Sequence, residues 1–207
     1  MRPKQWSFTP ADDSLTGFVS NATGATWTLS TTTPNDTMAH LVSVVNDSAT
    51  DHSAKTVALV GTDVHGKAQT ETMALGAGSA TVVSTKYFKT LTTATPSATI
   101  GADTMDVGWT DDVISATFIP DFKQAPFNMA IGVDISGTIS YDIQHTFDDP
   151  FSGAYSDMTW FDHSTLAAKT ADADGNYAAP VRGIRVLLNS LTATATLKVT
   201  FIQGGVS

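Results

Sequence analysis

The near absence of glutamate constrains the fold more than any other feature of this chain. Glu71 is the only glutamate, beside nineteen aspartates, and threonine is the most abundant polar residue. Helices use glutamate freely, whereas threonine suits the pleated surface of a strand and aspartate suits turns. This bias predicts an all-β protein with antiparallel sheets and long loops.

The chain length and one break in its pattern predict two β-sandwich-like domains. A chain of 207 residues can hold one large β domain or two of about 100 residues each. Two prolines and paired aspartates interrupt the threonine-rich pattern between Asp111 and Pro126, and a linker near Pro120 gives two domains of ordinary size. We therefore expect an N-terminal arm (1–20), an N-terminal β domain (21–119) and a C-terminal β-sandwich domain (120–207).

Short runs of strand length, bounded by turn residues, fill both expected domains. The predicted strands are 26–30, 40–46, 55–61, 68–74, 80–84 and 104–109, followed by 127–133, 138–147, 181–189 and 194–203. Residues 55–75 should form a hairpin in which Gly66 supplies a positive φ, and residues 76–79 should be the turn of the next strand pair. In the last strand, apolar residues alternate with mainly polar ones, which predicts one buried face and one solvent face.

Charge and composition exclude several classes of function. The formal net charge is −9 and the basic residues are scattered, which argues against a nucleic-acid partner. No stretch approaches the roughly 20 apolar residues that span a bilayer, and no apolar run follows the early cations Arg2 and Lys4 as it would in a secretory signal. Cysteine is absent, so packing or assembly must hold the fold together.

The candidate chemical motifs are weak, and we expect neither an enzyme nor a cofactor. Residues 172–176 (DADGN) resemble the start of a calcium loop, but the remaining ligands are missing and an Asx-rich turn is favoured. Asp162 and His163, near Asp148 and Asp149, could suggest acid–base or metal chemistry, although a polar turn explains them better. The phosphate-loop, dinucleotide and nucleophile-elbow motifs are all absent. We place His40 and the histidines at 52 and 65 on turns or sheet surfaces.

A long loop, residues 148–180, carries more aromatic residues than a solvated loop needs. Two readings remain open: these rings cap an open end of the sandwich, or they are buried against another chain. The irregular, partly apolar N-terminal arm, with Trp6, Phe8, Leu15 and Phe18, is expected to dock on a neighbouring subunit or on the shell of a larger assembly. The candidate interface residues are Trp6, Phe8, Phe151, Tyr155, Trp160, Phe161 and Tyr177.

Two parts of the chain resemble known proteins. Residues 52–109, from HSAKTVALVGTDVHGKAQTE through to ATIGADTMDVGW, resemble a segment of structural proteins in tailed bacteriophages. Residues 137–150 (GTISYDIQHTFDDP) and 159–205 (TWFDHSTLAAKTADADGNYAAPVRGIRVLLNSLTATATLKVTFIQGG) resemble the C-terminal β-sandwich of the same proteins. The resemblance is one of pattern, and it transfers no functional residue.

The resemblance implies a virion component that is made in the host cytoplasm and has no active site. Our first expectation is a capsid decoration or cement protein, a homo-oligomer such as a trimer, bound to the major capsid protein or other virion proteins without nucleic acid or membrane. A neck, tail or baseplate protein is the alternative within the same class. A carbohydrate-binding module is the alternative from another class, with Tyr155, Trp160 and Tyr177 as its stacking platform.

Overall fold

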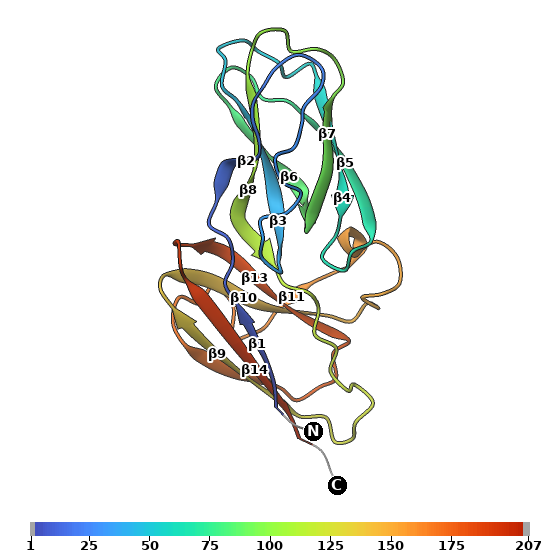
Figure 1. Ribbon diagram of the computed structural model, residues 1–207. Coiled ribbons are helices and arrows are strands. Elements are labelled where there is room, and N and C mark those ends of the chain that lie inside the picture. The colour runs from blue at the N-terminus through green and yellow to red at the C-terminus, as the bar shows by residue number, and fades with distance from the viewer. Residues whose placement is uncertain (1–2, 205–207) are drawn as a thin grey trace. The chain divides into compact units, whose positions relative to one another are not determined.

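The structure is a computed structural model that describes residues 3–204, and its secondary structure is almost entirely β-strand. The chain divides into two compact units. The N-terminal unit comprises residues 11–113, and the C-terminal unit combines residues 114–204 with the preceding segment 3–10. Antiparallel sheets build both units (Figure 1), so the predicted all-β, sandwich-like fold class is confirmed.

The N-terminal unit contains two sheets. In one, β8 pairs with β2 and β3, and β3 also pairs with β6; in the other, the order is β5-β4-β7. The strands are β2 (Ser14–Ala22), β3 (Ala39–Asn46), β4 (Thr56–Thr62), β5 (Ala68–Ala74), β6 (Thr81–Phe88), β7 (Thr90–Pro96) and β8 (Met105–Ile114). Alternate residues of both sheets, among them Val42, Leu59 and Val107, form one buried apolar cluster.

The hairpin predicted over residues 55–75 is confirmed as β4 and β5. Its turn has Gly66 at φ +82°, a left-handed conformation that glycine adopts without steric cost. The Asp63 carboxylate organises the turn by accepting hydrogen bonds from the backbone N–H groups of His65 and Lys67, at 2.8 and 2.9 Å.

The strand pair expected across residues 76–79 does not form, because β6 pairs with β3 and not with β5. Segment 76–79 is held by the β3–β4 connection: the Asn46 amide donates to the carbonyls of Gly76 and Ala77, and the Ser79 N–H donates to Ser48. These contacts fix the connection between β5 in one sheet and β6 in the other.

Glu71 joins the two sheets of the N-terminal unit at this crossing. From β5, its carboxylate accepts hydrogen bonds from the backbone N–H groups of Thr85 and Lys86 in β6, at 2.8 and 2.9 Å, and from the Thr85 hydroxyl at 2.9 Å. The Lys86 ammonium returns a bond to the carbonyl of Thr70. Side chains thus replace the missing backbone ladder between β5 and β6.

The C-terminal unit is a second pair of sheets, with strand orders β1-β14-β9-β12 and β11-β10-β13. The elements are β1 (Lys4–Phe8), β9 (Met129–Ser136), β10 (Ile139–Thr146), the short 3-10 helix η1 (Tyr155–Asp157), β11 (Phe161–Asp162), β12 (Ala173–Tyr177), β13 (Gly183–Leu191) and β14 (Thr196–Gln203). The alternation predicted for the last strand is confirmed, since Leu197, Val199 and Phe201 are buried while Ile202 is exposed.

The structure places the N-terminal segment differently from the expected arm. Residues Lys4–Phe8 form β1, which pairs with β14 in the C-terminal unit; Figure 1 shows this blue strand beside the red one. The Trp6 ring packs edge-on against Phe8, Phe118 and Phe201 at 5.8–6.0 Å. Phe18, also assigned to the arm, is buried in β2 of the N-terminal unit. Alternating apolar residues within 3–22 therefore build each unit's own core, and the second boundary falls between residues 113 and 114, at the end of β8, rather than near Pro120.

Candidate functional site

An exposed aromatic patch lies at one edge of the C-terminal unit. Phe147 follows the end of β10 and is 57% exposed, and Phe161 begins β11 and is 47% exposed. Their ring centroids are 5.9 Å apart, and each ring also contacts His145, at 5.4 and 5.8 Å. We call these three residues the aromatic patch. Exposed aromatic rings grouped in this way are typical of protein contact surfaces.

The imidazole of His145, in the aromatic patch, is held by a hydrogen bond to a neighbouring strand. The Tyr177 hydroxyl, from β12, is hydrogen-bonded to Nδ1 of His145 at 3.0 Å. Burial lowers the pKa of His145 and the neighbouring His163 lowers it further, although Asp162 opposes the shift. Burial also raises the pKa of Tyr177. The imidazole is therefore a neutral, anchored support for the two phenylalanine rings.

Two exposed carboxylates follow the phenylalanines of the aromatic patch in sequence, but Asp162 lies with Gln144 on the opposite face of the β10–β11 pair from His145 and Phe161. Asp148 and Asp162 each directly follow one of its phenylalanines and are exposed. Asp148 Oδ2 accepts from the backbone N–H of Thr159 at 2.7 Å, and Asp162 Oδ1 accepts from the Gln144 amide at 2.8 Å. Both donors are neutral, so the charges of these two carboxylates are not cancelled by them. Residues 147–162 contain four aspartates and no lysine or arginine.

Two arginines in the same unit are engaged elsewhere. Arg182 forms an ion pair with Asp149 at 2.9 Å, and its guanidinium lies 5.2 Å from the Phe122 ring. The Arg185 guanidinium stacks 4.3 Å from Trp160 and hydrogen-bonds Gln144. Arg185 lies beside Gln144 on the face that carries Asp162, and its partners there are neutral, so its charge is retained.

The candidate interface residues from the sequence divide into three groups. Phe151 and Phe161 are exposed, Trp6 and Trp160 are half-buried, and Phe8, Tyr155 and Tyr177 are buried in their own unit. With two of its three rings buried, the stacking platform proposed for a carbohydrate does not face solvent. Sequence reasoning missed Phe147 because it ends an alternating run and was assigned to the strand 138–147.

The suspected acid–base group does not assemble. Asp162 bonds Gln144, Asp148 bonds Thr159 and Asp149 pairs with Arg182, whereas His163 is buried and contacts the Asn176 carbonyl and Thr165. Asp162 belongs to β11 rather than to a turn. These residues stabilise loop 148–170 and do not converge on a common point.

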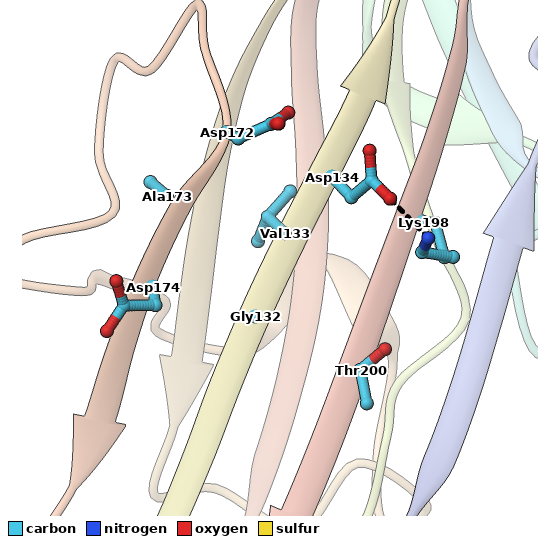
Figure 2. A pocket seen from close by; sticks show the side chains of 8 residues that line it. All are labelled: Gly132, Val133, Asp134, Asp172, Ala173, Asp174, Lys198 and Thr200. Atoms are coloured by element: carbon cyan, nitrogen blue, oxygen red, sulfur yellow. Dashed lines mark hydrogen bonds and ion pairs between the residues drawn. The ribbon is translucent and has the colours of Figure 1, made fainter.

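The outer face of the β12-β9-β14 sheet holds a shallow groove of about 390 Å³, with charged side chains among its lining residues (Figure 2). Gly132 forms its floor, between the cross-strand partners Asp174 and Thr200. Asp134 and Lys198 form an ion pair on one side, and Asp172 accepts a hydrogen bond from the Ile135 N–H at 2.8 Å. Residues 173–176 are thus part of a paired strand, not the expected turn or calcium loop.

Two histidines of the N-terminal unit are buried, contrary to the expected surface positions. His40 bonds the Thr110 carbonyl through Nδ1 at 2.9 Å and Asp36 through Nε2 at 2.8 Å. His52 contacts Asp103 at 2.9 Å and the Lys55 ammonium at 3.1 Å. Both histidines tie loops to strand ends, which is a structural role.

The Asp36 carboxylate has several hydrogen-bond partners. Burial is the largest influence on its pKa and acts to raise it, but the hydrogen bond and charge of His40, together with the N–H groups of Ala11 and Met38, outweigh burial and lower the pKa below its ordinary value. Asp36 therefore stays ionised in a largely buried position.

Carboxylates also gather around Asp12, Asp13 and Asp111, where one oxygen of each lies within 4.8 Å of the others. The Asp13 N–H donates to Asp111 at 2.9 Å. All three belong to the N-terminal unit and lie near its surface. Exposed acidic groups of this kind are common without an ion.

No protein-family model matches this chain, and a search of curated proteins finds no similar sequence. Within residues 3–204, the structure contains no helix with the length and hydrophobicity needed to cross a bilayer.

Proposed function

We propose that this chain is a non-enzymatic structural component of a tailed-phage virion, most specifically a capsid decoration protein. Two things support the proposal: the resemblance of residues 52–109 and 137–205 to phage structural proteins, and the exposed aromatic patch on an all-β unit. A neck, tail or baseplate protein is the alternative within the same class.

The aromatic patch is the observation that carries the proposal. Interface cores are enriched in aromatic rings, and a few rings in a well-supported setting provide most of the binding energy. Phe147 and Phe161 are exposed, while His145 and Tyr177 hold the surface beneath them in place. A rigid aromatic surface loses little conformational entropy on binding.

Repetition on a shell makes a small contact sufficient. If the chain is a homo-oligomer, each copy presents one aromatic patch, and simultaneous contacts raise the effective concentration of the remaining ones. The partner is then the major capsid protein or another virion protein, and the chain passes from the host cytoplasm into the virion.

Cryo-electron microscopy of particles made with and without this chain tests the proposal. Density at threefold or hexamer-centre positions on the shell, absent from particles that lack the chain, would support a decoration role. Density on the tail axis would support the neck or tail alternative. Identical particles in the two preparations would overturn both.

A further inference from the structure

We propose that strand β1 joins copies of this chain by strand exchange, in which β1 of one copy occupies the position beside β14 in the C-terminal unit of another copy. We call this position, with the rings of Phe118 and Phe201 beside it, the β1 slot. The inference goes beyond the proposed function, because it concerns contacts between copies of the chain and does not require a particle. Three features carry it: the place of β1 in the sequence, the match between β1 and the slot, and the connection that follows β1.

Strand β1 belongs to the C-terminal unit but is separated in sequence from the rest of it by the whole N-terminal unit. Residues 3–10 precede the N-terminal unit, and residues 114–204 follow it. The N-terminal unit has an apolar core of its own, to which β1 does not contribute. The C-terminal unit therefore receives one strand from a distant segment, and that segment can come from its own chain or from another copy.

Strand β1 fits the β1 slot through both its backbone and its side chains. All five residues of β1 pair with β14 in antiparallel register (Figure 1). The Trp6 ring packs edge-on against Phe118 at 5.8 Å and Phe201 at 5.9 Å. Phe8 is buried at the end of the same strand. An empty slot would leave the edge of β14 unpaired and these rings uncovered, and both features promote association. A C-terminal unit that lacks β1 therefore binds β1 from whichever chain supplies it.

The connection after β1 has the properties of a hinge. Only Thr9 and Pro10 separate the end of β1 from Ala11. The Ala11 backbone N–H donates to Asp36 at 2.8 Å, so Ala11 is already anchored on the N-terminal unit. Thr9 is exposed and lies outside the strands. Hinges are a few loop residues that absorb a change in backbone angles, so a change at Thr9 redirects β1 while the N-terminal unit keeps its contacts.

Exchange conserves the contacts that β1 makes in the β1 slot. The same ladder and the same ring contacts form whether β1 and β14 belong to one chain or to two, so only the hinge and the supply of strands differ. A chain's own β1 competes with the strands of other copies through its effective concentration, which is about millimolar for a short connection. Exchange therefore increases with protein concentration and becomes extensive where copies are crowded together.

Engineered cysteines test the exchange, because the chain contains none of its own. Gln5 and Thr200 are cross-strand partners on the outer face of the sheet, and their side chains are hydrogen-bonded at 3.4 Å. Directly opposed residues have Cα atoms about 4.5–5.5 Å apart, within the range of a disulfide. One chain carries Gln5→Cys and a second chain carries Thr200→Cys. The ladder then brings the two cysteines together only when β1 of one chain pairs with β14 of the other.

In the matched control, Asp174→Cys replaces Thr200→Cys. Asp174 is exposed on β12 and lies in the same cross-strand row as Thr200, with Gly132 between them (Figure 2). Strand β12 is three strand spacings from β1, roughly 14 Å, which is too far for a disulfide within the sheet. Disulfides in the control therefore measure random collisions between folded chains.

Equal amounts of the two chains are unfolded together in urea, refolded at about 1 or about 100 µM, and diluted to about 1 µM before oxidation, so that collisions are equally rare in all samples. Non-reducing electrophoresis and mass spectrometry of peptides then measure the disulfide between positions 5 and 200. After refolding at the higher concentration, we expect about tenfold more of this disulfide than of the control disulfide. Its yield should rise roughly in proportion to the refolding concentration. A yield no higher than the control, or one independent of refolding concentration, would overturn the inference.

A single chain that carries both Gln5→Cys and Thr200→Cys gives a second measurement. We expect an internal disulfide after refolding at about 1 µM and covalently linked copies after refolding at about 100 µM. Internal disulfides alone at both concentrations would show that β1 stays in its own chain, and absence of any disulfide would contradict the pairing of β1 with β14; either result overturns the inference. If a cysteine at position 5 or 200 prevents folding, Ser7→Cys and Lys198→Cys provide the next outward pair. Because these experiments use the purified chain alone, their failure leaves the proposed virion role to be judged by microscopy.

Discussion

The N-terminal unit buries Phe18, Trp27 and Phe88 in its core, whereas the C-terminal unit leaves Phe147 and Phe161 open to solvent. Their charges also differ: residues 11–113 contain eleven acidic residues and four lysines, while residues 114–207 contain nine aspartates and five basic residues. The N-terminal unit is thus the more acidic of the two, and these large aromatic rings are buried in it. Because exposed aromatic rings are typical of contact surfaces, the contact proposed above belongs to the C-terminal unit.

The largest expected effect comes from a chain that begins at Ala11 and therefore lacks β1. The truncation removes the Trp6 ring, which packs on Phe118 and Phe201, and the buried Phe8; each large aromatic ring is worth roughly 3–5 kcal/mol in a core. Differential scanning calorimetry should show the transition of the C-terminal unit lost or lowered strongly, with that of the N-terminal unit unchanged. If both transitions were unaltered, residues 1–10 would not belong to the core of the C-terminal unit, and the external arm expected from the sequence would be favoured.

In the N-terminal unit, the next largest loss of stability is expected from removing hydrogen bonds rather than apolar contacts. Glu71→Ala leaves the backbone N–H groups of Thr85 and Lys86 without their acceptor, and we expect a loss of about 1–3 kcal/mol in the free energy of unfolding. Urea unfolding followed by tryptophan fluorescence measures it. Glu71→Gln keeps one acceptor oxygen, so its free energy of unfolding should lie between those of the wild type and Glu71→Ala. Equal stability of all three proteins would show that this side chain does not hold β5 and β6 together.

A smaller effect concerns the pH dependence of stability, which should differ between the two units. The folded-state pKa of Asp36 lies below the ordinary value of 3.8, so its contribution to stability is present above that value and is lost as the pH falls through the folded pKa. Asp36→Asn should therefore flatten the acid-side loss of stability of the N-terminal unit and leave that of the C-terminal unit unaltered. An unchanged pH profile for the N-terminal unit would contradict the assigned interaction with His40.

The smallest effect concerns one imidazole of the C-terminal unit. Burial lowers the pKa of His145 below its ordinary value of 6.5, so stability that depends on the neutral ring is lost as the pH falls below that value. An NMR titration should give a midpoint below 6.5. Tyr177→Phe removes a hydrogen bond that favours the neutral ring and should raise the midpoint; a midpoint insensitive to Tyr177→Phe would place the hydroxyl away from Nδ1.

Local sequence patterns predicted the fold class and many of the strands. The 55–75 hairpin was predictable because Gly66 and Asp63 specify its turn locally. Pairing between distant segments was not, since short threonine-rich strands specify register weakly. Thus β7 was overlooked, residues 26–30 do not form the predicted strand, and β12 was hidden within a segment whose aspartates and glycine suggested a turn.

The candidate site was predictable only in outline. An excess of aromatic rings in 148–180 indicated a contact surface, but alternation could not tell buried Tyr155 and Tyr177 from exposed Phe161, because loop residues follow no period. The buried histidine contacts were equally hidden. His52 meets Asp103 across 51 residues of sequence, a pairing that only the folded unit brings about.

Strand β1 also sets the order of events during synthesis. Lys4 pairs with Phe201 and Phe8 with Leu197, so the first strand must wait for nearly the last one. At translation rates of about 5–20 residues per second, that delay is roughly 10–40 s, far longer than a small β unit needs to fold. The N-terminal unit, encoded entirely between the two strands, can therefore reach its folded state while the C-terminal unit is still incomplete, and the closing of β1 on β14 is a step that follows the synthesis of β14.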